Sequence, residues 1–306
     1  MTASISDEGW AIAVEDLHMS YGPREVLHGL DLFVRRGEIF AVLGPNGAGK
    51  TTTIEILEGF RRRSTGHVSV LGVDPERATS AWRERVGVVL QASTPEPDLS
   101  VHETLTLYAG YYANPAPIER LLDVCGLSEQ ASLRNRRLSG GQQRRLDVAL
   151  ALVGQPDLLF LDEPTTGFDP AARHAAWEMV AGLKELGTTI VLTTHYLEEA
   201  EFLADRIAVI DQGRIVAEGT PQDLGNRHLA PTEISFRTVP LVSSWPLPIE
   251  LHSDGRLKLQ THRATEDLCT LTSWAVARDI ELLDFEVRRP SLEDTYLQLT
   301  EGSVRA

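Results

Sequence analysis

Cysteine, long apolar runs and positive charge are all scarce in this chain of 306 residues. The two cysteines, Cys125 and Cys269, lie in segments with a helical pattern, so we expect two packed thiols in a reducing cytosol and no disulfide framework. The longest apolar stretches, such as 148–153 and 158–161, are far shorter than the ~20 residues that a membrane-spanning helix needs. We therefore expect the chain to be soluble on its own.

Acidic side chains outnumber basic ones, 44 to 29, which gives a formal net charge of -15. General nucleic-acid binders present a broad basic surface that releases counterions from phosphates. The composition argues against that class, and no nucleic-acid partner is expected. Residues 1–10 contain Asp7 and Glu8 and no apolar core, so we also expect no secretory signal there.

Hydrophobic patterning predicts an α/β fold. Residues 12–21 and 26–34 alternate between polar and apolar side chains, as expected of half-buried antiparallel strands. Four later segments are almost entirely apolar, the pattern of strands covered on both faces, and they span 39–43, 158–161, 189–192 and 207–210. Because helical segments separate these four, we expect them to form a parallel core sheet.

Between residues 92 and 153 the pattern becomes helical, and Ser100 with Glu103 has the spacing of a capping box. We expect an inserted helical subdomain there. Residues 207–217 predict a hairpin that closes the first domain, and 221–231 is typical of a linker.

Beyond the linker, the pattern predicts strands that begin near 234, 249, 256 and 280, with a helix at 264–278. A last helix is expected from Pro290, with Ser291 and Asp294 as cap partners. The predicted organisation is a main domain over residues 1–225 and a small C-terminal α+β domain over 226–306.

A glycine-rich loop follows the buried strand at 39–43 and opens a helix, and it reads Gly44, Pro45, Asn46, Gly47, Ala48, Gly49, Lys50, Thr51 and Thr52. Glycines allow backbone N–H groups to approach phosphate oxygens, and a helix N-terminus favours anions. Lys50 would then contact the β and γ phosphates, and the Thr51 hydroxyl would bind Mg²⁺. The alternative is a glycine-rich turn without a ligand.

A pair of carboxylates ends the apolar strand at 158–161. Ligands of open α/β sheets usually bind at the carboxyl edge of the strands, which is where Asp162 and Glu163 are expected. Asp162 would hold the metal with its water shell, and Glu163 would face the attacking water as a general base.

The third motif is the pentapeptide Leu138-Ser139-Gly140-Gly141-Gln142. It resembles the signature of the ATP-binding cassette (ABC) family, and with the two other motifs this resemblance covers about the first 225 residues. The resemblance implies a P-loop nucleotide-triphosphatase fold with an antiparallel β subdomain and an ATPase activity that uses ATP and Mg²⁺. It also implies that Ser139, Gly140, Gly141 and Gln142 reach the γ-phosphate of an ATP bound to a second copy of the domain.

Four further residues match positions of the family. Tyr21 resembles the aromatic residue that stacks on adenine, although an ordinary strand aromatic is the alternative. Gln91 resembles the glutamine that contacts Mg²⁺ and the attacking water. Asp169 lies in a segment that resembles the loop crossing the dimer interface of the family. His195 resembles the histidine that bonds the γ-phosphate and orients the general base. Five arginines flank the signature and either raise the local potential or lie on a solvated helix face; they are Arg134, Arg136, Arg137, Arg144 and Arg145.

The ending at 290–296 resembles the exporter branch that includes daunorubicin-type drug-resistance ATPases. The resemblance implies a subunit that is peripheral to the cytoplasmic face of the membrane and is a homodimer partner. It also implies separate polytopic permease subunits, which dock near Gln91 and export a drug-like or amphipathic substrate. Two alternatives stay open: a soluble cassette ATPase that acts on nucleic acid or ribosomes, and a cassette complex that transmits force without moving solute. The C-terminal domain is either a stabilising appendage or a regulatory one.

Overall fold

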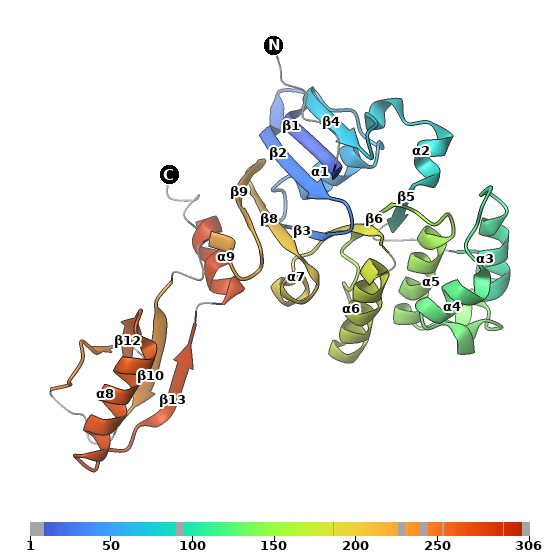
Figure 1. Ribbon diagram of the computed structural model, residues 1–306. Coiled ribbons are helices and arrows are strands. Elements are labelled where there is room, and N and C mark those ends of the chain that lie inside the picture. The colour runs from blue at the N-terminus through green and yellow to red at the C-terminus, as the bar shows by residue number, and fades with distance from the viewer. Residues whose placement is uncertain are drawn as a thin grey trace. The chain divides into compact units, whose positions relative to one another are not determined.

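The chain folds into two compact units, Met1–Pro221 and Gln222–Gly302 (Figure 1). The computed structural model describes residues 9–89, 95–185, 187–225, 230–238, 244–252, 254–289 and 291–301.

An antiparallel sheet opens the first unit, with strand order β2-β1-β4. Its strands are β1 (Trp10–Tyr21), β2 (Arg24–Arg35) and β4 (Thr65–Val70). The alternating pattern therefore predicted the first two strands correctly. It missed β4, because only the second half of that short strand is buried.

A six-stranded sheet forms the centre of the first unit, in the order β5-β6-β7-β3-β8-β9. The strands are β3 (Ile39–Leu43), β5 (Val86–Val89), β6 (Leu158–Asp162), β7 (Thr189–Thr193), β8 (Arg206–Asp211) and β9 (Arg214–Gly219). Strands β5, β6, β7, β3 and β8 run parallel, and β9 pairs with β8 in the antiparallel sense. The predicted fold class, with its parallel core sheet, is confirmed.

The helices of this unit are α1 (Lys50–Leu57), α2 (Ser80–Glu84), α3 (Val101–Ala109), α4 (Ile118–Val124), α5 (Gly140–Leu152), α6 (Pro170–Glu185) and α7 (Leu197–Leu203). Three of them, α3, α4 and α5, fall within the predicted helical insert. The capping box expected at the start of α3 is present, because Glu103 N donates to Ser100 Oγ and Ser100 N donates to the Glu103 carboxylate.

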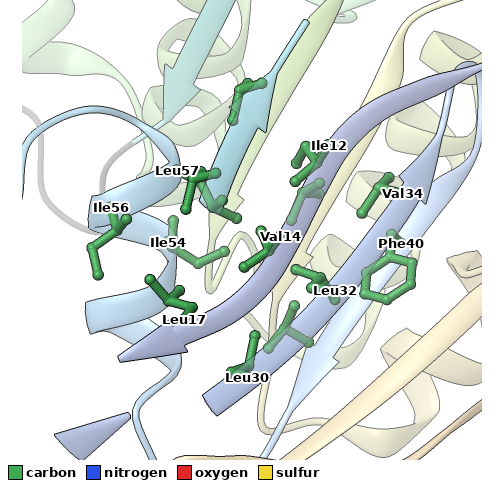
Figure 2. Close-up of a cluster of buried hydrophobic side chains, with 14 of the residues drawn as sticks. Ile12, Val14, Leu17, Leu30, Leu32, Val34, Phe40, Ile54, Ile56 and Leu57 are labelled. Carbon is green, nitrogen blue, oxygen red and sulfur yellow. The ribbon is translucent and has the colours of Figure 1, made fainter. Parts of the chain in front are cut away.

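One hydrophobic cluster joins helix α1 to both sheets of this unit, and Figure 2 shows part of it. Val14 of β1, Leu32 of β2 and Phe40 of β3 are fully buried in it. Ile54 and Leu57 bring α1 into the same cluster. Since α1 follows the glycine loop, this apolar contact fixes the loop above the end of β3.

The second unit has a four-stranded sheet in the order β11-β12-β10-β13. Its elements are β10 (Thr232–Arg237), β11 (Glu250–Leu251), β12 (Leu257–Thr261), α8 (Ala264–Val276), β13 (Leu283–Arg288) and α9 (Leu292–Glu301). Phe236 and Leu271 lie in its core. Ser291 and Asp294 do cap the last helix, which begins at Leu292. No helix in the described part of the chain has the length and apolarity to cross a bilayer.

The expectation of two packed thiols is half wrong. Cys125 is buried after α4, and burial raises the pKa of its thiol to about 12. Cys269 is exposed on α8. An amphipathic helix on one face of a sheet buries only one side, and Cys269 lies on the other.

Candidate functional site

Lys50 directly follows Gly49 of the glycine loop and is the first residue of α1. Its ammonium group donates to the carbonyl oxygens of Gly44 at 2.6 Å and Pro45 at 3.0 Å. Burial lowers the pKa of this amine, and the charges of Glu163 and Asp162 oppose that shift. A buried cation with neutral hydrogen-bond partners is suited to receiving an anion such as a phosphate.

Two glycines of the loop are required by its geometry. A Cβ at Gly44 would lie 2.2 Å from the carbonyl oxygen of Ile210 on β8, so no side chain fits there. Gly49 precedes α1 with φ of 109°, a left-handed conformation that glycine adopts without strain. These two glycines therefore fix the path of the loop.

The loop borders a cavity of about 380 Å³. Its lining comes from four separate parts of the chain and comprises Tyr21, Arg24, Val26, Asn46, Gly47, Gly49, Lys50, Thr51, Thr52, Asp162, Glu163 and Thr193. Gly44 and Ala48 are buried within the loop, and Pro45 is exposed. We call this space the loop cavity. The structure thus brings the predicted base-stacking, phosphate-binding and acidic residues to one place.

Thr193 at the end of β7 holds both acids and was not predicted. It pairs with Asp162 in the parallel register, and its hydroxyl donates to Asp162 Oδ1 at 2.5 Å. The backbone N–H of Glu163 donates to the same hydroxyl at 3.1 Å. Glu163 has φ of 45°, a strained backbone that occurs often at functional sites. A threonine at the end of an apolar strand was the available sequence signal.

His195 lies next to Glu163, with Nδ1 at 3.4 Å from Glu163 Oε1. Its ring contacts the ring of Tyr196 at 4.1 Å between centroids, and the guanidinium of Arg173 lies over Tyr196 at 4.1 Å. The other carboxylate oxygen of Glu163 accepts from the Thr166 hydroxyl at 3.0 Å. Glu163 is therefore oriented from both sides.

The signature residues lie outside the loop cavity. Ser139 caps α5, and Gln142 completes the capping box by accepting from Ser139 N at 2.9 Å. A second cavity of about 520 Å³ is lined by Ser139, Gly140, Gly141, Asp169 and also by Glu163, among others. Asp169 Oδ1 accepts from the backbone N–H of Ala172 and thereby caps α6. Gln91 lies outside the described residues.

Arg144 connects the signature helix to the acidic strand end. Its guanidinium donates to the carbonyl oxygens of Asp162 at 2.6 Å and Pro164 at 3.2 Å. Burial lowers its pKa, although the surrounding carboxylates oppose the shift. Of the two interpretations offered for the flanking arginines, the solvated helix face is therefore wrong for Arg144.

Glu58, directly after α1, is a third acid, and its pKa is affected by burial and by the charge of Asp162. Burial, with smaller contributions from the charges of Asp162 and Glu55, raises the pKa of its carboxyl to about 8. A neutral Glu58 adds no negative charge beside Asp162 at neutral pH.

Comparison with known proteins places the chain in a family. A family model described as ABC transporter matches residues 27–166, and a second, described as the C-terminal domain of ABC transporter domain-containing protein-like sequences, matches residues 232–291. A Nod factor export ATP-binding protein I of Ralstonia nicotianae is 38% identical over 96% of this chain and 95% of its own length. A daunorubicin resistance ATP-binding protein of Streptomyces coeruleorubidus is 38% identical over 95% of this chain and 96% of its own length.

A linearmycin resistance ATP-binding protein of Bacillus subtilis is 34% identical over 96% of this chain and 99% of its own length. Among solved structures, cbiO1 of Clostridium perfringens, part of the ABC transporter complex cbiONQ, has a TM-score of 0.64 and 28% identity over 71% of this chain and 90% of its own. An ATP-binding subunit of another ABC transporter has a TM-score of 0.62 and 30% identity over 70% of this chain and 91% of its own.

The chain therefore belongs to the ABC transporter family. It is an ATP-hydrolysing, ATP-binding subunit of the exporter type, as the three motifs and the C-terminal ending predicted.

Thr193→Val should lower ATP hydrolysis about tenfold or more, because it removes a hydroxyl bonded to a charged group, and such bonds contribute ~1.5–3 kcal/mol. Valine keeps the β-branched shape in a buried strand. Thr193→Ser, which retains the hydroxyl, is the matched control and should stay near the wild-type rate. Phosphate release at saturating ATP measures both variants. Equal rates for Thr193→Val and wild type would show that the hydroxyl does not orient the acids.

Proposed function

We propose that two copies of this chain bind two ATP molecules between them, with Ser139, Gly140 and Gly141 of one copy completing the loop cavity of the other. The open space at the start of α5 carries this proposal. Apart from the neighbouring residues and backbone of its own helix, a Cβ on Gly140 would meet no atom within 4 Å, and one on Gly141 would meet only Ala172, at 3.9 Å. Close approach of a second molecule would explain why both positions are glycine.

The polar groups of the loop cavity fit ATP with Mg²⁺. Lys50 and the loop N–H groups would bind the phosphates, and the oxygens of Thr51, Asp162 and Gln91 would bind the metal or its waters. Among the described residues, no group of three or more His, Cys, Asp or Glu side chains could hold a metal. Mg²⁺ usually keeps several waters and phosphate oxygens as ligands. The bound ion would neutralise charge on the phosphates.

Glu163 would accept the proton of the attacking water, and His195 would orient that carboxylate and bond the γ-phosphate. Tyr21 would stack on the adenine, and Asp169 would lie at the seam between the two copies. Since hydrolysis removes the γ-phosphate from the joint, the pair would close on ATP and open on ADP.

Glu163→Gln should slow ATP hydrolysis by about 10²- to 10⁴-fold, the range typical of a general base, while ATP binding persists. The amide preserves the shape of the side chain and cannot take the proton. Single-turnover phosphate release and nucleotide binding measure the two effects separately. Glu178→Gln, an exposed acid on α6, is the matched control. A Glu163→Gln rate equal to wild type would refute the assignment.

ATP should convert the Glu163→Gln protein from its monomer mass of 33.7 kDa to a dimer, because hydrolysis no longer opens the joint. Sedimentation with and without ATP tests this. Adding Gly140→Leu should block the dimer without unfolding the chain, since the position is open within one copy. A monomer at high protein concentration with ATP, before Gly140→Leu is introduced, would count against the shared site.

We further propose that the dimer is peripheral to the cytoplasmic face of a membrane and drives export of a hydrophobic or amphipathic, drug-like substrate through separate permease subunits. The export and resistance names of the relatives support this class of cargo. Docking is expected near Gln91 and the helical segment. Co-expression with a polytopic membrane protein encoded by a neighbouring gene should retain the chain in the membrane fraction. Recovery of the chain only in the soluble fraction would contradict the proposal.

A further inference from the structure

Arg61 is fixed by Glu55 just after helix α1. The chain reverses there, so that the backbone N–H groups of Phe60 and Arg61 both donate to the carbonyl oxygen of Glu55, at 2.9 and 3.0 Å. Arg61 Nε also donates to Glu55 Oε2 at 2.5 Å. This hydrogen bond is the main reason that the pKa of the guanidinium is raised. Main-chain and side-chain contacts therefore hold Arg61 in one orientation.

The fixed guanidinium lies over the ring of Tyr21, with its central carbon 5.0 Å from the ring centroid. Tyr21 comes from the end of β1, and its hydroxyl lies 3.3 Å from the Thr52 hydroxyl in the first turn of α1. The loop-cavity lining includes Tyr21 and Thr52 and does not include Arg61. Because Arg61 does not line the cavity, we take its guanidinium to cover the ring face turned away from the cavity, which would leave the other face available to a base.

We infer that Arg61, held by Glu55, is a positioning residue for the base of ATP: it fixes the Tyr21 ring so that the purine stacks on the face opposite the guanidinium. The inference rests on the proposed stacking role of Tyr21. That ring is 41% exposed, and the contact of its hydroxyl with Thr52 holds only its outer end. A planar cation over an aromatic ring supplies such a restraint, and an ammonium group supplies it less well.

This arrangement separates base recognition from phosphate recognition. The phosphates would contact Lys50 and Thr51 at the start of α1, whereas Arg61 lies beyond the other end of that helix. Loss of Arg61 should therefore weaken the binding of a nucleotide and leave the binding of a phosphate chain without a base unchanged. Inorganic tripolyphosphate is the probe that makes this distinction.

Arg61→Ala should raise the dissociation constant of the full chain for ATP about two- to fivefold. This change corresponds to the ~0.5–1 kcal/mol of an exposed cation–π contact, since about 1.4 kcal/mol is a tenfold change. The constant for tripolyphosphate should not change. Calorimetric titration measures both. Arg61→Lys keeps the charge, and its dissociation constant for ATP should lie between those of Arg61→Ala and the wild type. Arg62→Ala removes an arginine from the exposed neighbouring position and should bind both probes as wild type does.

A double-mutant cycle with Tyr21→Leu completes the test. In that background Arg61→Ala should have no further effect on ATP binding, because no ring is left to position. An equal loss of tripolyphosphate binding, an undiminished effect in the Tyr21→Leu background, or no effect of Arg61→Ala on ATP binding would each overturn the inference. If Tyr21→Leu itself binds ATP as tightly as wild type, the stacking role fails instead, and the inference fails with it.

Discussion

The parallel alignment of β3, β7 and β6 is the constraint on which the site depends. These strands end at the same edge of the sheet, so the loop after β3, the acids at the end of β6 and the histidine after β7 meet there. The Thr193 hydroxyl joins β7 to both acids. A shift of one residue between these strands would turn Thr193 to the other face of the sheet and separate it from Asp162.

At this edge of the sheet, burial disfavours the charged form of Lys50, whereas the apolar packing of helix α1 keeps that lysine in place. Burial lowers the pKa of Lys50 and so disfavours its charged form. The negative charges of Glu163 and Asp162 partly offset that effect. The helix that begins with this lysine buries Ile54 and Leu57 in the apolar cluster. Apolar burial of the helix therefore holds in place a cation that a low-dielectric environment would otherwise disfavour.

Local patterns in the sequence were sufficient for most of the fold and for the class of site. Continuous apolar segments identified four core strands, and the spacing of Ser100 and Glu103 identified a helix start that the structure confirms. The contacts of Thr193, Arg144 and Arg61 were not predictable in the same way. They depend on strand order and on chain reversal, and β7 lies between β3 and β6 although it follows both in sequence. The roles of the individual site residues stay predictions.

A side chain at Gly140 or Gly141 would meet few atoms of its own chain. The requirements of folding and of assembly therefore differ at these two positions. Most positions are constrained by neighbours within one copy, and substitutions there register as lost stability. At these two glycines the proposed neighbour belongs to another molecule. Selection for the stability of a single chain would not maintain these glycines. Selection for formation of the dimer would. For this part of the surface, thermal stability of the purified subunit is a poor guide to whether a sequence variant is harmless.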